Sequence, residues 1–301
     1  MKILVTGAWR CNEFQLNELR NLGNEIVFMQ NENGELPVAP SEIDGVICNG
    51  LFLYHNIEQF NNLKYIQLTS AGFDRVPMDY VKEHSIEIYN AKGVYSIPMA
   101  EYAVCGVLQL YKQSKFFMEN QKEHIWERHR GLLELYGKNV CIVGCGNVGT
   151  ECAKRFGAFG CNIYGVDIYP RIDKDYLKIV DLNKLDSVLK KAEIIVLTLP
   201  LTAQTENLFN EERIAKIKDG AILVNISRGG VVDTKSLAKS LNNHLGGAVL
   251  DVFEEEPLDE SSYLWDMENV IITPHNSFVG EHNKDRLWQV IVDNLGGKNE
   301  Y

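Results

Sequence analysis

Three polar residues follow apolar, strand-length segments in the second half of the chain: Arg228, Glu256 and His275. The carboxyl ends of parallel strands face one crevice, so these side chains are expected to meet there. Reduction of a carbonyl by hydride needs a cation that orients the substrate, a proton donor, and a group that keeps the donor charged. An arginine fork suits the first task, a histidine the second and a carboxylate hydrogen-bonded to the imidazole the third. The three residues together therefore predict a hydride-transfer enzyme.

Each of the three has an ordinary structural explanation when it is taken alone. An arginine at a strand end is commonly a surface or ion-pair residue, and Glu256 belongs to an acidic triplet, residues 254–256, which could be a solvated turn. His275 could be a structural histidine after a buried strand. The functional interpretation depends on their combination with a dinucleotide-binding loop.

That loop is Gly144-x-Gly146-x-x-Gly149, which follows an apolar strand, residues 139–143. The first glycine permits a tight turn, the second lets the backbone approach a pyrophosphate, and the third lets the next helix pack closely. That helix is expected from Thr150 to about Phe159, with its N-terminus directed at the phosphates. The cofactor is therefore expected to be a dinucleotide.

Asp167 lies 18 positions beyond Gly149, at the end of a second apolar strand, residues 162–166. An acidic residue at about this distance grips the adenosine ribose. Its charge would repel a 2′-phosphate, so NAD is expected in preference to NADP. Arg171 lies four residues further on and could weaken this preference.

The first ninety residues alternate between short apolar strands and helical or turn segments, as in a small doubly wound parallel sheet. The strands are expected at Lys2–Thr6, Glu25–Met29, Gly45–Cys48, Tyr65–Leu68 and Glu87–Tyr89. A helix with an apolar face is expected at residues 14–22. Three loops at strand ends could contact a ligand: residues 49–54, 69–74 and 91–96.

Within these loops, the small residues Ser70, Ala71 and Gly72 could present backbone N–H groups to a substrate carboxylate, although an ordinary turn is the simpler interpretation. Phe52, Tyr54 and Tyr95 could shape an apolar pocket, although aromatic residues are more often part of a core.

A long helix is expected from Pro98, and residues 120–135 are expected to be a linker or an arm packed on a partner subunit. Beyond the glycine-rich loop, strands are expected at residues 193–199, 220–226, 247–252 and 270–273. Helices are expected at residues 237–241 and at about 281–295.

Composition excludes several classes of protein. The chain has 301 residues, a net charge of −11 and a pI of about 5.2, which argues against nucleic acid or an anionic membrane as a partner. No apolar run is long enough for a membrane span, and the N-terminus lacks the apolar core of a signal peptide. Seven cysteines, without a C-x-x-C pair, favour a reducing cytoplasm, buried thiols and no metal site.

Several motifs resemble the D-isomer-specific 2-hydroxyacid dehydrogenase family. They are residues 143–149 (VGCGNVG), 225–233 (NISRGGVVD), 250–257 (LDVFEEEP) and 273–275 (TPH). Residues 70–74 and 99–101 also look like that family's substrate loop and crossing helix. The resemblance covers the chain from about residue 64 to 296.

The resemblance implies an α/β protein with two doubly wound parallel-sheet domains and a cleft between them. A flavodoxin-like substrate domain is expected at residues 1–94 and 277–301, and a Rossmann cofactor domain at residues 95–276. It implies NAD as the cofactor, a small 2-oxo acid as the substrate and a homodimer. The family's acid directly precedes the proline, which selects Glu256 over its two neighbours.

The resemblance also implies the roles of individual residues. Arg228, Glu256 and His275 would be catalytic, the backbone of Ala71 and Gly72 would contact the substrate carboxylate, and Asp251 would contact the nicotinamide carboxamide. Further cofactor contacts would come from Gly144, Gly146, Asn147, Val148, Gly149, Asp167, Thr198, Leu199 and Pro200. Phe52 and Tyr95 are the candidates for the substrate side-chain pocket.

Two features limit the match. Residues 276–279 (NSFV) are bulkier than the small-residue run that is frequent in the family, so Phe278 could narrow the cleft. The chain also ends soon after its last expected helix.

The sequence also has features in common with three other classes of protein. A short-chain dehydrogenase is suggested by residues 6–8 (TGA) and by Tyr111 and Lys115, but the glycines it needs after Gly7 are absent. An NAD-sensing binding protein, as in the related C-terminal-binding corepressors, could keep the same three residues, although the long disordered tails of an adaptor are missing. Formate dehydrogenases share the fold, but their partner for the histidine resembles Gln.

Overall fold

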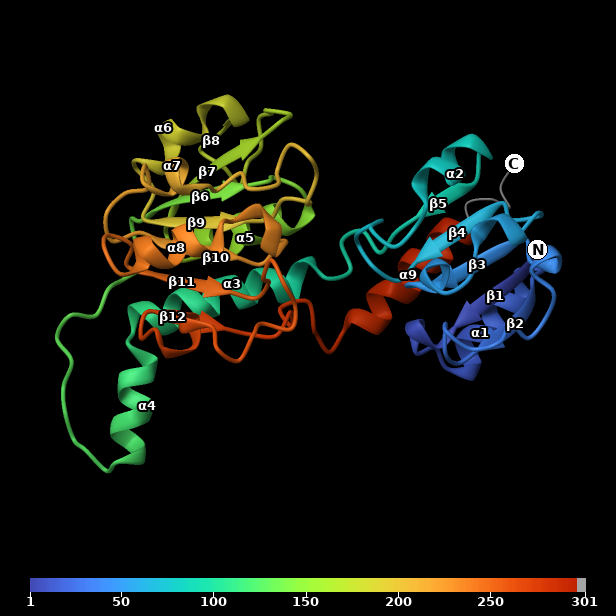
Figure 1. The fold of residues 1–301 in the computed structure, drawn as a ribbon, viewed down its shortest axis with the longest axis horizontal. Coiled ribbons are helices and arrows are strands. Elements are labelled where there is room, and N and C mark those ends of the chain that lie inside the picture. Colours follow the sequence, from blue (N-terminus) through green and yellow to red (C-terminus); the bar gives the residue numbers. More distant parts are fainter. Residues whose placement is uncertain (297–301) are drawn as a thin grey trace. The chain divides into compact units, whose positions relative to one another are not determined.

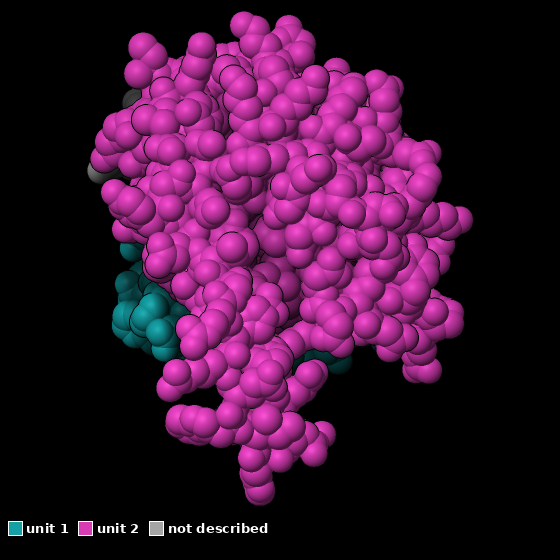
Figure 2. Space-filling model, turned by 90° about the vertical axis from the view of Figure 1, so that its left-hand side faces the viewer, with its two compact units in different colours: residues 1–95, 280–301 teal, residues 96–279 magenta. Residues whose placement is uncertain are grey.

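The computed structural model describes residues 1–296, and this chain forms two compact units (Figure 1). Unit 1 contains Met1–Tyr95 and the segment that begins at Gly280, and unit 2 contains Ser96–Val279 (Figure 2). The expected divisions were after residue 94 and before residue 277. Tyr95 belongs to unit 1 because its hydroxyl donates to the carbonyl of Thr69, and Ser277 belongs to unit 2 because its N–H donates to Asp251 at 3.0 Å.

Unit 1 is built on a five-stranded parallel sheet in the order β2-β1-β3-β4-β5. The strands are β1 Lys2–Thr6, β2 Glu25–Met29, β3 Gly45–Cys48, β4 Tyr65–Leu68 and β5 Glu87–Tyr89. This order is that of flavodoxin-like sheets, so the predicted fold of this unit is confirmed. Every residue of β3 and β4 is buried, as expected for strands covered on both faces.

The helices of unit 1 are α1 Glu13–Asn21, α2 Met78–Glu83 and α9 Asn283–Gly296. α1 begins with a capping box, because the side chain of Asn12 accepts from the N–H of Gln15 and the Gln15 side chain accepts from Asn12. α9 buries Leu287, Ile291 and Leu295 in a core that it shares with β1. The last helix therefore belongs to the same unit as the first strand.

Unit 2 is built on a seven-stranded parallel sheet in the order β12-β11-β10-β9-β6-β7-β8. The strands are β6 Asn139–Val143, β7 Asn162–Asp167, β8 Lys178–Asp181, β9 Ile194–Leu197, β10 Ile222–Asn225, β11 Gly247–Leu250 and β12 Val270–Ile272. The strand order reverses between β6 and β9. This is the Rossmann switch point, where ligands bind at the carboxyl ends of the strands.

The helices of unit 2 are α3 Ser96–Tyr111, α4 Ser114–Lys122, α5 Asn147–Ala158, α6 Leu185–Leu189, α7 Glu211–Ile214 and α8 Thr234–Leu241. α3 packs its small residues on the sheet, and a Cβ added to Gly106 would lie 2.5 Å from Val249 Cγ1. The helix expected from Pro98 is therefore present, with Pro98 in its first turn, where the missing N–H costs no helix bond.

One expectation from the sequence was wrong in detail, and one strand was missed. The helix after the glycine loop begins at Asn147 rather than Thr150, because Gly146 has the extended backbone of an N-cap residue (φ −76°, ψ −157°). Strand β8 was not predicted, because only Ile179 and Val180 are apolar in a segment bounded by Lys178 and Asp181. β8 is an edge strand, so it needs less apolar character than the buried central strands.

α4 projects from the layered body of unit 2, and residues 123–135 run from its end back to that body, where the N–H of Leu133 donates to the carbonyl of Tyr111 at 3.0 Å (Figure 1). α4 takes up the first residues of the segment that was expected to be an arm. Trp126, in the middle of this segment, is 97% exposed. Within residues 1–296, no helix is both long and apolar enough to cross a membrane.

Candidate active site

The three glycines of the loop after β6 meet different constraints. Gly144 has φ +97°, a conformation that favours glycine. A Cβ on Gly149 would lie 2.1 Å from the carbonyl oxygen of Gly144, so a larger residue would push α5 away from the loop. A Cβ on Gly146 would meet nothing within 4 Å, so the fold does not require glycine there. The open space at Gly146, directly before the N-terminus of α5, fits a dinucleotide pyrophosphate on Asn147 and Val148.

Asp167, the last residue of β7, is tied to the glycine loop. Its carboxylate accepts from the N–H of Cys145 at 2.7 Å and from the N–H of Tyr169 at 2.9 Å. The Arg171 guanidinium donates to the Cys145 carbonyl at 2.5 Å, so a positive charge lies over the same loop. Burial raises the pKa of the Cys145 thiol to about 12, so it remains neutral and packs as an apolar group.

Thr198 follows β9 and supports the loop from the neighbouring strand. Its hydroxyl donates to the Gly144 carbonyl at 2.6 Å. A Cβ on Gly144 would lie 3.1 Å from Leu199 Cδ2, so Leu199 is also close to the turn. Pro200 is exposed, and its carbonyl accepts from the Thr205 hydroxyl at 2.6 Å. Thr198 and Leu199 therefore lie against the glycine turn, whereas Pro200 leads away from it.

Arg228 lies in the loop after β10, which is stabilised by hydrogen bonds between its own residues. Asn225 accepts from the hydroxyl of Ser227 at 2.8 Å, and the Arg228 guanidinium donates to the carbonyl of Ser227 at 2.8 Å. A Cβ on Gly229 would lie 1.8 Å from the backbone carbon of Phe253. The Arg228 loop is therefore in backbone contact with the loop that leads from β11 to Glu256.

Glu256 and His275 form a hydrogen-bonded pair. His275 Nδ1 lies 2.8 Å from Glu256 Oε2, and Glu256 Oε1 accepts from the N–H of Phe253 at 3.1 Å. The pair fixes the imidazole through one nitrogen, while the His275 side chain is 42% exposed. Nε2, on the opposite side of the ring, is the atom that could exchange a proton with a substrate.

A hydrogen-bond network around the buried Asp251 fixes the segment that carries His275. Asp251 is fully buried, and its carboxylate accepts from the N–H groups of Asn276 at 2.7 Å and Ser277 at 3.0 Å. It also accepts from the Thr273 hydroxyl at 2.5 Å, so the Tyr102 hydroxyl, 2.6 Å from the same Thr273 oxygen, must act as a donor. Burial raises the pKa of Tyr102, which keeps this hydroxyl protonated.

Tyr102 and Thr273 were not predicted. Thr273 belongs to the quoted Thr-Pro-His motif and Tyr102 follows Glu101, but no spacing in the sequence brings α3 and the end of β12 together.

The backbone of His275 itself is strained, with φ +50°. Its N–H donates to the Asp251 carbonyl at 2.8 Å, which supports this conformation.

The predicted substrate residues lie in unit 1. In the loop after β4, the Ser70 carbonyl accepts from Ala91 N–H at 2.8 Å, and the Ala71 carbonyl from the Asn90 amide at 2.5 Å. The Gly72 carbonyl accepts from the Ser70 hydroxyl at 3.0 Å. Because consecutive carbonyls point at these internal donors, the N–H groups of the same peptide units point the other way.

The two aromatic candidates differ in their surroundings. The Phe52 ring packs edge-on against Phe60, with ring centroids 5.8 Å apart. The Tyr95 hydroxyl donates to the carbonyl of Thr69, next to the substrate loop. Tyr54 is 60% exposed. Phe278 lies in unit 2, where its ring meets His275 edge-on at 6.0 Å.

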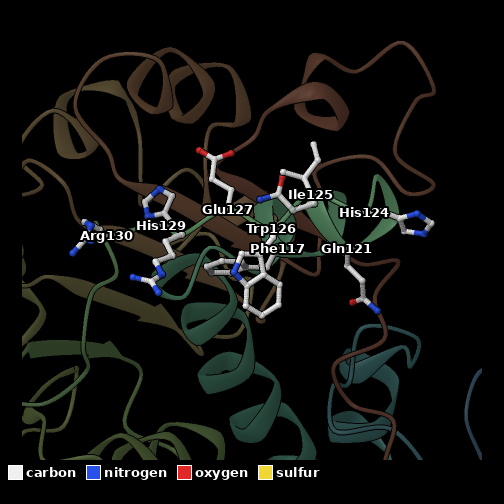
Figure 3. Close-up of a pocket in the computed structure, with 10 residues that line it drawn as sticks. Phe117, Gln121, His124, Ile125, Trp126, Glu127, His129 and Arg130 are labelled. Carbon is white, nitrogen blue, oxygen red and sulfur yellow. The ribbon is translucent and has the colours of Figure 1, made fainter.

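A cavity of about 740 Å³ lies in unit 2 between α4 and the segment after it (Figure 3). Phe117, Trp126 and His129 are among the residues that line it. This cavity contains none of the predicted catalytic or cofactor residues. Within residues 1–296 there is also no group of three or more His, Cys, Asp or Glu side chains that could hold a metal ion.

The comparisons with known proteins decide the family. Residues 104–277 match the family model described as D-isomer specific 2-hydroxyacid dehydrogenase, NAD binding domain. The chain belongs to this family. It is therefore an NAD-dependent 2-hydroxyacid oxidoreductase, and unit 2 carries its NAD-binding domain.

The relatives differ in substrate. The chain is 32% identical to an (S)-sulfolactate dehydrogenase from Chromohalobacter salexigens, over 79% of this chain and 78% of the relative. It is 34% identical to a glyoxylate reductase from Thermofilum pendens, over 78% of this chain and 71% of the relative. A solved structure of D-lactate dehydrogenase from Aquifex aeolicus, with NAD and lactic acid, superposes with a TM-score of 0.78 at 25% identity, covering 99% of this chain and 96% of that one.

Proposed function

We propose that this dehydrogenase reduces a small 2-oxo acid to the D-2-hydroxy acid, with His275 as the proton donor. The observation that carries the proposal is the 2.8 Å bond between His275 Nδ1 and Glu256 Oε2. It lies at the carboxyl edge of a sheet whose switch-point loop fits a dinucleotide.

NADH, when bound, supplies the hydride. His275 gives the proton from Nε2 to the oxygen that becomes the hydroxyl, and it takes the proton back in the oxidising direction. Glu256 holds the ring in one orientation and stabilises the imidazolium before transfer. Arg228, whose loop is in contact with the loop of Glu256, orients the substrate carboxylate with its fork.

The cofactor contacts follow the geometry of unit 2. Gly144, Gly146 and Gly149 shape the pyrophosphate turn, and Asn147 and Val148 provide the first N–H groups of α5. Asp167 receives the adenosine ribose, and Thr198 and Leu199 flank the turn, while the contact of Pro200 with the cofactor stays a prediction. Asp251 is fully buried and bonded to the His275 segment, so its contact with the nicotinamide carboxamide stays a prediction.

The substrate contacts of Ala71, Gly72, Phe52 and Tyr95 also stay predictions. The orientation of the carbonyls of residues 70–72 supports the first two, because it turns the intervening N–H groups outward as a carboxylate would require. We expect Phe52 and Tyr95 to favour branched or aromatic side chains over a phosphorylated one.

A panel of 2-oxo acids tests the proposal. Purified protein is supplied with NADH and, separately, with pyruvate, glyoxylate, hydroxypyruvate, 2-oxoisocaproate, phenylpyruvate and 3-phosphohydroxypyruvate, and NADH oxidation is recorded. Turnover of at least one acid, with a D-hydroxy acid as the product, is the expected result. Protein that binds NADH but oxidises none of it would contradict the proposal and favour an NAD-sensing role.

We also propose that the chain is a homodimer in which residues 114–135 contact the partner copy. This segment exposes Met118, Ile125 and Trp126 to solvent, at 58%, 52% and 97%. Such a concentration of exposed apolar residues on one segment is typical of an interaction site. Light scattering should give twice the chain mass for the wild type and the single chain mass for Trp126→Glu, whereas Tyr169→Glu, at another exposed aromatic, should remain dimeric.

A cytoplasmic location stays a prediction from the cysteine content.

A further inference from the structure

Glu32, in the loop after β2, connects three strands of unit 1 at their carboxyl ends. Its Oε1 accepts from the Thr6 hydroxyl at 2.8 Å and from the N–H of Asn49 at 2.6 Å. Its Oε2 accepts from the N–H of Gly50 at 2.7 Å. Thr6 ends β1, and Asn49 and Gly50 directly follow β3. The carboxylate therefore receives donors from the end of β1, which pairs with β2, and from the residues after β3, which pairs with the other side of β1.

The backbone of Glu32 holds the other end of the same loop. The carbonyl of Glu32 lies 2.9 Å from His55 Nε2. A carbonyl oxygen can only accept, so the imidazole must donate through Nε2. One residue thus fixes residues 49–55 at both ends, with its side chain at Asn49 and Gly50 and with its main chain at His55.

Residues 51–54, between these two attachments, are partly exposed to solvent. Leu51 is fully buried, whereas Leu53 and Tyr54 are each 60% exposed. Phe52 is half-buried beside Phe60. The loop also neighbours the proposed carboxylate loop, because the N–H of Thr69 donates to the Cys48 carbonyl at 2.8 Å. Phe52 and Tyr54 are therefore presented at the ligand-binding edge of the sheet on a loop whose ends are fixed.

We propose that Glu32 is a positioning residue that holds residues 49–55 and so makes the enzyme prefer 2-oxo acids with apolar side chains. This inference rests on the proposed function. A carboxylate is required because it accepts at both oxygens. Glutamine offers one acceptor and would turn an NH₂ group toward one of the N–H donors. The held loop keeps its aromatic side chains in one place, which lowers the ordering cost of binding an apolar substrate.

The kinetic test compares two substrates. 2-Oxoisocaproate has a branched side chain and glyoxylate has none, so only the first depends on the loop. Glu32→Gln should lower kcat/KM for 2-oxoisocaproate by about tenfold through KM, as expected for loss of a bond to a charged group. The value for glyoxylate should change less than about twofold, and the Kd of NADH should not change. Glu35→Gln, at an exposed carboxylate in the same loop, is the matched control.

The structural test does not need turnover. Amide hydrogen exchange, followed by NMR, should be slow at Asn49 and Gly50 in the wild type and faster in Glu32→Gln, with no change in Glu35→Gln. His55→Ala releases only the far end, so it should lower the preference for 2-oxoisocaproate in the same direction by a smaller factor. This variant leaves the buried Thr6 hydroxyl paired, so it tests the inference if Glu32→Gln is poorly folded.

The outcomes are distinguishable. A parallel loss for both substrates would show a general structural role and overturn the inference, as would an unchanged preference with faster exchange at Asn49 and Gly50. Unchanged exchange would show that Glu32 does not hold the loop. If the wild type reduces neither acid nor any other of the panel, the proposed function fails and the specificity role fails with it, while the exchange result still decides whether Glu32 holds the loop.

Discussion

The carboxyl edges of the two parallel sheets use their polar residues in opposite ways. In unit 1 the carboxylate of Glu32 is bonded to backbone and hydroxyl donors, and the carbonyls of residues 70–72 accept from donors of the same unit. In unit 2 a hydrogen-bonded ionisable pair remains partly exposed, with 42% of the His275 side chain and 37% of the Glu256 side chain accessible. A fixed backbone suits recognition of a carboxylate, whereas an exposed ionisable pair suits proton transfer. Both sheets are parallel, although they differ in strand number and order, and it is the loops at their carboxyl edges that carry these different polar groups.

The strongest test of this division removes the imidazole. His275→Ala should lower kcat by roughly 10² to 10⁴, the contribution of a general acid–base group, with the Kd of NADH little changed. Stopped-flow measurement of NADH oxidation checks the chemical step. His84→Ala, at an exposed histidine of unit 1, should keep full activity. An unchanged kcat in His275→Ala would remove the proton-transfer role from unit 2.

Gly146→Val tests whether the open space before α5 is used by the cofactor. A Cβ at position 146 meets no protein atom within 4 Å, so the melting temperature of the variant should stay within a few degrees of the wild type. The Kd of NADH should rise roughly 100-fold, because backbone bonds to the phosphate are lost. Fluorescence titration with NADH measures the change. Gly157→Ala, at an equally open position within α5, should bind normally. Normal binding by Gly146→Val would mean that the pyrophosphate lies elsewhere.

Glu256→Gln tests the partner of the histidine. Loss of a charge-assisted bond should lower kcat by roughly 10- to 100-fold, less than removal of the ring itself. The adjacent Glu255→Gln, which keeps the 2.8 Å pair intact, should lie close to the wild type in steady-state assays. Equal losses in the two variants would indicate a general effect of the acidic loop.

Asp167→Asn tests the smallest of these effects, the choice between NADH and NADPH. Removing the charge should reduce the ratio of kcat/KM for NADH over NADPH by about tenfold, because the 2′-phosphate is no longer repelled. Asp181→Asn, in register with Asp167 on the next strand, controls for a general change of charge at this edge. A wild-type ratio below one would overturn the expected preference.

Much of the fold was predictable because burial leaves a strong pattern. The five strands of unit 1 lie where the apolar runs indicated, and the central strands of unit 2 are fully buried. Edge strand β8 and the short helix α2 were not predicted, because a partly exposed segment needs few apolar residues. The start of α5 was displaced because a glycine N-cap, unlike Ser or Asp, gives no recognisable signal.

The candidate site likewise has features that were predictable from the sequence and features that were not. Glycine spacing, the acid after β7 and the motifs around Arg228, Glu256 and His275 were evident in the sequence, because each depends on neighbours a few residues away. The contacts of Tyr102 with Thr273 and of Glu32 with Asn49 were not evident, because they join residues far apart in the chain.

The α/β class, the dinucleotide loop and the three candidate catalytic residues were predictable from the sequence alone. The tertiary structure was needed to show that His275 Nδ1 is bonded to Glu256 and that Asp251 holds residues 273–277, which carry His275. The tertiary structure also shows that Glu32 is hydrogen-bonded to both ends of the loop of residues 49–55. The physical reason is that local patterns fix backbone conformation and burial, whereas hydrogen bonds between distant side chains depend on how the strands are ordered in a sheet.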